Sequence, residues 1–270
     1  MDAQRRNRYL EAIGVDIWVR RPGGPLAGMQ NAQPVIQPEP CAAAQQSPAA
    51  RAASELVAPL SAPSGPQSGD VATGWEALRT EVLSCTKCGL HETRTQGVVG
   101  VGPQRADWMV IGEAPGAEED RKGEPFVGRA GHLLDAMLHA IGLNRGTNVY
   151  IANVLKSRPP GNRDPKPEEV AACLPYLMRQ IALLQPRLML AVGRIAAQNL
   201  LNTDMPLSRL RGTVHHFGEL NTPLIVTYHP AYLLRTPADK RKAWEDLKFA
   251  RGVFRQLTDR VGTGTDGNLP

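Results

Sequence analysis

The sequence contains few cysteines and no long apolar run. There are four cysteines in 270 residues, and in a chain without secretory features a Cys-x-x-Cys pair more often indicates metal or redox chemistry than a structural disulfide. No stretch approaches the roughly 18 consecutive apolar residues of a membrane-spanning helix. The arginines near the N-terminus are not followed by an apolar segment, so we expect no secretory signal and a cytoplasmic protein.

The composition allows a substantial core but says little about a partner. A length of 270 residues with 42% hydrophobic residues is enough for one domain of ordinary size and additional segments. The formal net charge is +5. Lys and Arg supply the salt-dependent part of nucleic-acid affinity, but many soluble proteins are equally basic, so charge alone does not identify a polyanionic partner.

The chain divides into four segments by composition. Residues 1–20 are a small amphipathic segment with a basic beginning, and residues 21–73 are rich in Pro, Ala, Gln, Ser and Gly. A segment with so few large apolar groups cannot offset its ordering entropy by burial, so we expect a disordered linker. Residues 74–258 form the compact domain, and residues 259–270 a flexible tail. The amphipathic segment either docks onto the domain or, held on its long linker, binds another protein.

Apolar runs alternate with helical patterns along the compact domain. Four short apolar runs indicate buried strands, at residues 107–111, 149–153, 188–192 and 224–227. Apolar residues at helical spacing, or proline followed by acidic residues, indicate helices at about 75–84, 131–141, 167–184, 195–201 and 238–257. This alternation predicts an α/β fold, a three-layer α/β/α sandwich around a central, mainly parallel four-stranded sheet.

Two segments that directly follow predicted strands carry ionisable side chains beside prolines. One is Gly112-Glu113-Ala114-Pro115-Gly116, and the other begins with Tyr228-His229-Pro230. In an open parallel sheet, ligands bind where the carboxyl ends of strands meet loops, so we expect a cleft here. The first segment lacks the spacing of a phosphate-binding loop, and its Gly and Pro content alone would also fit a simple strand-to-helix turn.

The compact domain resembles the iron–sulfur (family 4) uracil-DNA glycosylases. The matching pieces, in order and spacing, are residues 112–116, 125–131, 153–156 with 158–163, and 229–235. The resemblance implies a uracil-DNA glycosylase-like fold and a DNA-repair enzyme that hydrolyses the N-glycosidic bond of deoxyuridine, releasing uracil and leaving an abasic site. It implies base flipping, no nucleotide cofactor, and uracil-containing DNA as the partner of a monomeric protein. A repair or replication protein is then the expected partner of residues 1–20.

The resemblance assigns the pocket to five residues. Phe126 is expected to stack on the flipped base, and Asn153 to offer a donor and an acceptor to its Watson–Crick edge. His229 is expected to donate a hydrogen bond to the uracil oxygen as negative charge grows there. Gly112 and Ala114 complete the substrate-binding set. The plainer readings are core packing for Phe126, a turn-closing side chain for Asn153 and a loop cap for His229.

The residue that orients the attacking water is less well defined by the sequence. Other branches of the superfamily carry an acidic residue at the position of Ala114, which leaves Glu113 and Glu119 as candidates. Either carboxylate would orient water or stabilise the cationic sugar. The plainer reading of each is a surface carboxylate.

The segment that follows His229 resembles the loop with which this family wedges into the minor groove. Leu233 or Leu234 would fill the gap left by the flipped nucleotide, and core packing is the competing explanation for at least one of them. Arginines on both sides of the expected cleft would hold phosphates. They are Arg235, Arg158 and Arg163.

The expected metal site departs from the family pattern. A [4Fe–4S] cluster takes four cysteine thiolates, and Cys85, Cys88 and Cys173 match three of them, but Ser157 stands at the position of the remaining one. Three options stay open: a cluster with Ser157 or an external ligand at one iron, a zinc site completed by His91, or no metal. We expect a cluster with a structural role. Cys41 lies in the linker, without a family counterpart, at the end of a tether that would let it reach the site.

Two alternative functions follow from the same residues. The first is a catalytically impaired glycosylase-like module that binds DNA or another partner, which Ser157 favours. The second is a covalent uracil-binding relative, but the chain lacks the basic, His-containing insertion of such proteins.

Overall fold

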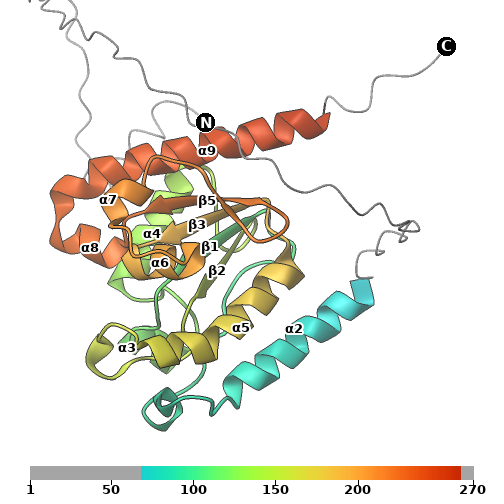
Figure 1. Cartoon of the computed structure of the whole chain (residues 1–270), viewed down its shortest axis with the longest axis vertical. Helices are drawn as coiled ribbons and strands as arrows, with labels where there is room; N and C mark the ends of the chain where they lie inside the picture. Colours follow the sequence, from blue (N-terminus) through green and yellow to red (C-terminus); the bar gives the residue numbers. More distant parts are fainter. Residues whose placement is uncertain (1–67, 263–270) are drawn as a thin grey trace, which may run out of the picture. The chain divides into compact units, whose positions relative to one another are not determined.

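The computed structural model describes residues 68–262, with side chains from 72 to 259 (Figure 1). The predictions for residues 1–20, for most of the linker, for Cys41 and for the end of the tail lie outside the described residues. No described helix is long and apolar enough to cross a membrane.

The centre of the described domain is a five-stranded sheet with the order β2-β1-β3-β5-β4. Four strands are parallel: β1 Trp108–Gly112, β2 Val149–Asn153, β3 Leu188–Val192 and β5 Thr222–Thr227. They are almost entirely buried because helices cover both faces of the sheet, which explains their unbroken apolar sequences. These four strands confirm the predicted sheet. A fifth, antiparallel strand, β4 His215–Phe217, was not predicted. It has only three residues, none fully buried.

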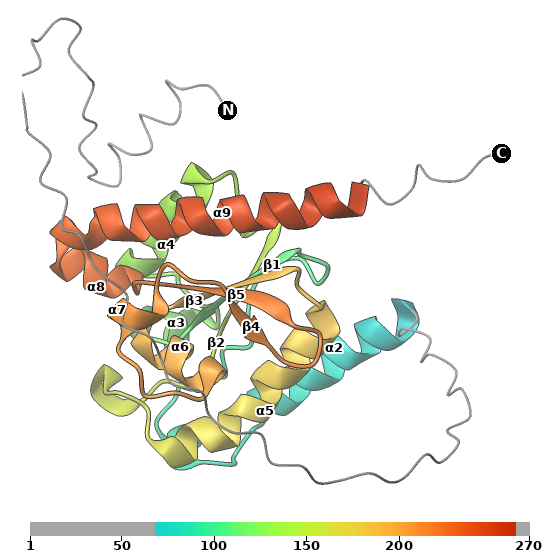
Figure 2. The same cartoon turned by 45° about the horizontal axis from the view of Figure 1, so that its top comes forward.

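Helices cover the two faces of the sheet and give the predicted three layers (Figure 2). One face packs against α2, α5 and α6, and the other against α4, α8 and α9. The bounds of the helices are α2 Ser68–Leu83, α3 Ala117–Lys122, α4 Arg129–Ala140, α5 Pro167–Leu184, α6 Arg194–Leu201, α7 Leu207–Leu210, α8 Pro230–Arg235 and α9 Lys240–Gly262. Short 3-10 turns occupy Gly89–Glu92, Pro160–Asn162 and Pro237–Asp239.

Several boundaries differ from the sequence-based expectations. Helix α2 begins at Ser68, six residues before the expected domain start at Gly74, and α9 continues to Gly262 inside the expected tail. The short helices α3, α7 and α8 occupy segments without a helical prediction. A helix of four to six residues shows too few turns for a periodic apolar pattern, and local caps define it instead. In α3, the Glu119 carboxylate accepts a hydrogen bond from the N–H of the N-cap residue Gly116, and Gly123 ends the helix at φ 77°.

The parallel arrangement brings the carboxyl ends of β1, β2 and β5 to one edge of the sheet. Gly112 at the end of β1 pairs in register with Asn153 at the end of β2. Thr227, the last residue of β5, pairs with Val192 of β3, and His229 follows two residues later. The two segments singled out in the sequence therefore lie at the same edge of the sheet, where an open α/β fold binds its ligand.

Candidate active site

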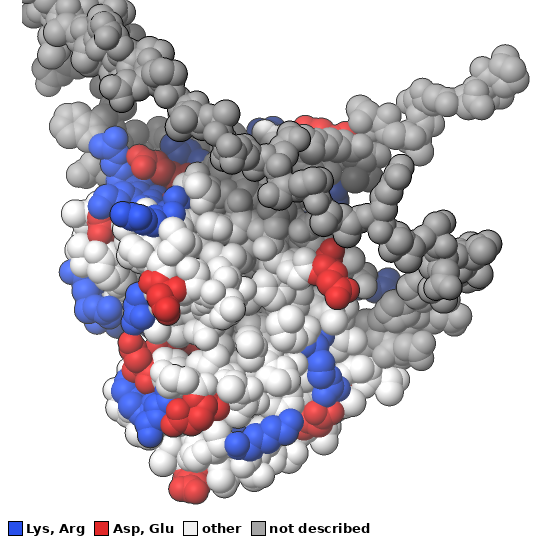
Figure 3. All heavy atoms as spheres, in the orientation of Figure 1, with Lys and Arg blue, Asp and Glu red and all other residues white. Residues whose placement is uncertain are grey.

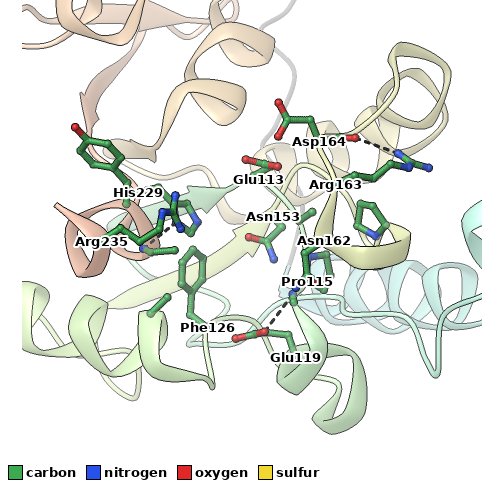
Figure 4. Close-up of a pocket in the computed structure, with 16 residues that line it drawn as sticks. Glu113, Pro115, Glu119, Phe126, Asn153, Asn162, Arg163, Asp164, His229 and Arg235 are labelled. Atoms are coloured by element: carbon green, nitrogen blue, oxygen red, sulfur yellow. Dashed lines mark hydrogen bonds between the residues drawn. The ribbon is translucent and has the colours of Figure 1, made fainter.

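A pocket of about 380 Å³ opens at this edge of the sheet (Figure 4). Its volume lies within the range of about 300–1,000 Å³ that is usual for small-molecule sites. Phe126, His229, Asn153 and Glu113 point toward one another across it. Its lining residues come from the loops after β1, β2 and β5: Glu113, Ala114, Pro115, Gly116, Glu119, Phe126, Ala130, Asn153, Pro159, Asn162, Arg163, Asp164, His229, Ala231, Tyr232 and Arg235.

The floor of the pocket depends on the close approach of Gly112, Phe126 and Asn153. A Cβ atom at Gly112 would lie 2.6 Å from the Phe126 Cζ atom and would also collide with the Asn153 Oδ1 atom. Glycine is required there so that the ring and the amide can both meet the backbone. Asn153 is 2% exposed, and its Oδ1 atom has no hydrogen-bond partner among the described residues. A buried polar atom without a partner costs stability, which points to a ligand as its partner.

Phe126 is held in an uncommon backbone conformation. Its φ is 55°, in the left-handed region that bulky residues rarely adopt. Arg145 donates hydrogen bonds to the carbonyls of Pro125, at 3.1 Å, and Phe126, at 2.8 Å, and forms an ion pair with Asp135. These contacts stabilise a turn that places the Phe126 ring 5.5 Å from the His229 ring, with 32° between their planes. Strain of this kind is typical of functional sites.

His229 is positioned by the turn that starts α8. Its Nδ1 atom accepts a hydrogen bond from the Ala231 N–H at 3.1 Å. Burial, together with the nearby Arg235 charge, lowers the pKa of His229 to about 4. The ring is therefore neutral at pH 7, and because Nδ1 is an acceptor, the single ring hydrogen is on Nε2. His229 thus offers one N–H donor and no positive charge.

Glu113 carries the carboxylate with the most perturbed pKa in the pocket. It follows β1 directly and is half-buried, and its carboxylate accepts no hydrogen bond from a described residue, whereas its backbone carbonyl accepts one from the Leu155 N–H. Burial, reinforced by the negative charge of Asp164, raises the pKa of Glu113 to about 7, although Arg194 opposes the shift. A carboxylate with this pKa can accept a proton near neutral pH, as a general base must.

Glu119 differs from Glu113 because backbone N–H groups engage its carboxylate. Oε1 accepts hydrogen bonds from Val127, at 2.9 Å, and Gly128, at 3.0 Å, and Oε2 accepts one from Gly116 at 3.1 Å. Glu119 therefore fastens the turn after β1 to the turn that carries Phe126. The sequence did not distinguish these two carboxylates. In the structure the Glu113 carboxylate has no hydrogen-bond partner among the described residues, whereas the Glu119 carboxylate accepts three backbone hydrogen bonds.

The residues expected to contact DNA have different surroundings. Leu233 is 1% exposed and packs with residues of α4 and α9, so it belongs to the core and is not accessible as a wedge. Leu234 is 37% exposed, and the exposed Arg235 lines the pocket. Two further arginines already have partners: Arg163 forms an ion pair with Glu169, and Arg158 donates to the Asn162 Oδ1 atom.

Positive side chains flank this part of the molecule. Helix α8 ends in Arg235, and α9 begins Lys240-Arg241-Lys242. On the face shown in Figure 3, Lys and Arg gather on the side formed by α8 and the beginning of α9. Cations at this place suit a polyanion that reaches the pocket from that side.

Three thiols of the expected metal site come from two parts of the chain. Cys85 and Cys88 follow α2, and Cys173 lies on α5, close enough that their charges add to the burial that raises the pKa of Cys173. Ser157 is 4% exposed, and its hydroxyl accepts a hydrogen bond from the Arg94 guanidinium at 2.8 Å.

These residues do not fit a [4Fe–4S] cluster held by cysteines alone, because the described residues supply three of four thiolates. The zinc option also lacks support. No three or more described His, Cys, Asp or Glu side chains are placed to share one metal ion. The Nδ1 atom of His91 lies 2.8 Å from the Cys88 carbonyl oxygen.

Four residues of the site were not identified from the sequence. Asp164 lines the pocket and raises the pKa of Glu113. Arg145 donates a hydrogen bond to the Phe126 carbonyl and so positions that residue. Arg94 donates a hydrogen bond to the Ser157 hydroxyl of the thiol site. Lys156 is 1% exposed, and burial lowers its pKa to about 7. Only Lys156 left a signal, as a lysine that directly follows the apolar pair Val154-Leu155 after β2. The others act through contacts that cross between loops.

Known proteins match the described domain over most of its length. The model of the uracil DNA glycosylase superfamily matches residues 99–248. A type-4 uracil-DNA glycosylase of Archaeoglobus fulgidus is 47% identical over 174 residues, which are 62% of this chain and 87% of that protein. One of Thermotoga maritima is 40% identical over 185 residues, 67% of this chain and 95% of that protein. A type-5 enzyme of Thermus thermophilus is 36% identical over 118 residues, 38% and 53% of the two chains.

Proposed function

The chain belongs to the uracil DNA glycosylase superfamily and, within it, to the type-4 group, and from that premise we propose that it hydrolyses the N-glycosidic bond of deoxyuridine in DNA. Water adds to the sugar carbon, the bond to the base breaks with its electron pair passing to uracil, and an abasic site remains. The substrate nucleotide must leave the base stack to reach the pocket, which costs a few kcal/mol.

The observation that carries the proposal is the Asn153 Oδ1 atom, which has no partner among the described residues and lies in the same pocket as the adjacent rings of Phe126 and His229. Uracil bound against Phe126 would stack on the ring and present its Watson–Crick edge to the Asn153 amide. The amide supplies an acceptor for the uracil N–H and a donor for a uracil oxygen. Cytosine presents an exocyclic amine in place of one acceptor, so the same amide discriminates against it.

His229 would stabilise the departing base. Negative charge develops on the uracil oxygens as the bond breaks, and a neutral ring with its hydrogen on Nε2 donates a hydrogen bond to one of them. A neutral donor suits this role because it keeps its hydrogen while the leaving group departs as an anion.

We assign the water to Glu113. Its carboxylate lines the pocket without a hydrogen-bond partner among the described residues, and its pKa of about 7 suits proton abstraction near neutral pH. The same negative charge would stabilise the oxocarbenium-like sugar. Glu119 acts as a positioning residue because its carboxylate is engaged by three backbone N–H groups.

DNA would lie over α8 and the loop after β2. Leu234 is the accessible leucine for the gap that the flipped nucleotide leaves. Arg235 is placed to hold a phosphate beside the pocket, and Arg158 and Arg163 would add charge across from it. No reaction step passes through the thiol site, whose expected role is structural, to brace the loops that line the DNA groove.

The experiment that tests the proposed function is release of uracil from a uracil-containing oligonucleotide, followed by strand scission in alkali at the abasic site. Asn153→Ala should bind the oligonucleotide and release little uracil. Wild-type protein that leaves the oligonucleotide intact over a range of salt concentrations would overturn the enzymatic assignment. DNA binding without scission would then support the alternative that Ser157 favours, a binding module that has lost activity.

A further inference from the structure

Lys156 is a buried residue whose amino group contacts the main chain of Asn153. Its Nζ atom donates hydrogen bonds of 2.6 Å to the Asn153 carbonyl oxygen and to the Gln180 Oε1 atom. The side chain is 1% exposed, and no carboxylate of the described domain lies within ion-pair distance. Burying a lysine without a carboxylate costs stability, so this arrangement calls for a functional explanation.

Gln180 extends the contact to two other segments. It lies on α5 with 0% exposure, and its Nε2 atom donates to the Val99 carbonyl, at 2.8 Å, and to the Tyr150 hydroxyl, at 3.3 Å. One amide therefore joins α5, the segment before β1 and the strand β2. All polar atoms of the Gln180 side chain have partners.

The Asn153 carbonyl lies on the side of β2 that faces away from β1. On that side Ile151 exchanges two hydrogen bonds with Val101, at 2.8 and 2.9 Å, and Asn153 follows two residues later with the same orientation. On the other side the Val154 N–H donates to the Gly112 carbonyl. The Lys156 amino group thus takes the place of a neighbouring strand at the residue where the ladder ends and the pocket begins.

We propose that Lys156 and Gln180 are positioning residues that hold Asn153 in the orientation needed to read the uracil edge. The inference rests on the proposed function of Asn153. Neither residue lines the pocket, so neither touches the substrate. Lys156 donates to the backbone carbonyl of Asn153, and Gln180 holds Lys156 in place. A small rotation of the Asn153 backbone would turn its side-chain amide away from the base.

The lysine amino group suits this task because it carries more than one N–H donor. It reaches an acceptor on β2 and another on α5 at the same time, whereas an apolar side chain of similar length would release both. A displacement of about 1 Å at a reacting group can cost about 100-fold in rate. The cost of burying the amino group is thereby offset by an Asn153 amide held in the orientation that reads the base.

Two substitutions of Gln180 separate positioning from general stability. Gln180→Leu removes the acceptor for Lys156 and the donor for Val99. Gln180→Glu also loses the donor but keeps an oxygen for Lys156. Both variants leave the Val99 carbonyl without its partner and differ at the acceptor for Lys156, so comparing them isolates the Lys156 contact from the loss at Val99. Gln96→Leu is the matched control, because it removes a glutamine that donates to the carbonyl of Arg121, far along the chain from Asn153.

The measurements are the single-turnover rate of uracil release and the Kd for uracil-containing DNA, each at a temperature where the variant is folded. Gln180→Leu should lose about 10- to 100-fold in rate with little change in Kd, Gln180→Glu should keep most of the rate, and Gln96→Leu should match wild type. Equal rate losses in the two Gln180 variants, a rate loss matched by the loss in Kd, or an unchanged rate in Gln180→Leu would each overturn the proposal.

Hydrogen exchange provides a readout that does not depend on catalysis. The amides of residues 149–155 should exchange faster in Gln180→Leu than in Gln180→Glu. If wild-type protein releases no uracil, the proposed function fails, and unchanged exchange at these amides separately overturns the positioning role.

Discussion

The Nδ1 atom of His229 accepts a hydrogen bond from the Ala231 N–H at 3.1 Å, and this contact determines where the ring carries its hydrogen. A neutral imidazole with Nδ1 as acceptor has its hydrogen on Nε2. The turn at the start of α8 therefore presets a neutral donor before any ligand arrives. Burial maintains this state by lowering the pKa of His229 to about 4.

Replacing His229 should slow uracil release without preventing DNA binding. We expect His229→Ala to lose about 10²- to 10³-fold in single-turnover rate, as for removal of one donor to a developing anion. The His229 resonances should show a neutral ring from pH 8 to below pH 5 in an NMR titration. Because the folded pKa lies below the ordinary 6.5, the ring's contribution to stability is present above pH 6.5 and is lost as the pH falls toward 4. A ring that titrates near 6.5 would contradict this account.

Glu113 should impose a pH dependence on the rate. The carboxylate form is the active one, so the rate should rise with pH through about 7, the pKa to which burial raises this group. Glu113→Gln should abolish this rise of the rate with pH and reduce the rate by about 10²- to 10⁴-fold, as for loss of a general base. The raised pKa also implies that the stabilising contribution of Glu113 is complete below pH 4.5 and is lost as the pH rises through 7. A rate profile of unchanged shape in Glu113→Gln would remove Glu113 from the mechanism.

Replacing Glu119 should lower the free energy of unfolding more than replacing the adjacent Glu118. Its carboxylate accepts three backbone hydrogen bonds, so Glu119→Ala should cost about 2 kcal/mol or more of unfolding free energy. Glu118 is the matched control, because it forms an exposed ion pair with Arg121, and such pairs contribute about 0–1 kcal/mol. Denaturant unfolding of the two alanine variants checks the difference. Equal effects would show that Glu119 does not fasten the two turns.

The sequence predicted the four parallel strands because each is a short, unbroken apolar run that two layers of helices bury. It placed Phe126, Asn153 and His229 in one pocket because their segments match a family and follow parallel strands. It did not separate Glu113 from Glu119, or Leu233 from Leu234. Those distinctions depend on which backbone N–H groups reach a carboxylate, and on which face of one helical turn meets the core.

The thiol site should respond to restoration of the missing cysteine. Arg94 donates a hydrogen bond of 2.8 Å to the Ser157 hydroxyl, and a cysteine at this position would restore the fourth cysteine of the family pattern, with Cys85, Cys88 and Cys173. Anaerobically purified Ser157→Cys should contain more iron than wild type, absorb more strongly near the visible–ultraviolet edge, and unfold at a higher temperature. Iron and zinc analysis of both proteins measures this. Equal iron content in the two proteins would show that Ser157 does not stand at a cluster ligand position.

The adjacent leucines of α8 should separate core packing from DNA contact. Leu233 is 1% exposed, so Leu233→Ala should destabilise the protein by about 2–5 kcal/mol, as for other large core deletions. Leu234 is 37% exposed, so Leu234→Ala should change stability by no more than about 0.5 kcal/mol.

Activity should follow the opposite order once the proteins are compared in the folded state. A wedge fills the gap in a duplex, whereas a single strand has no stacked partner to hold apart. Leu234→Ala should therefore lose more activity on double-stranded than on single-stranded uracil-containing DNA, and Leu233→Ala should lose the same fraction on both. Parallel single-turnover assays on the two substrates measure the ratio. Leu234 is the exposed leucine of α8, because Leu233 is buried. An unchanged ratio in Leu234→Ala would therefore mean that a group other than a leucine of α8 fills the gap.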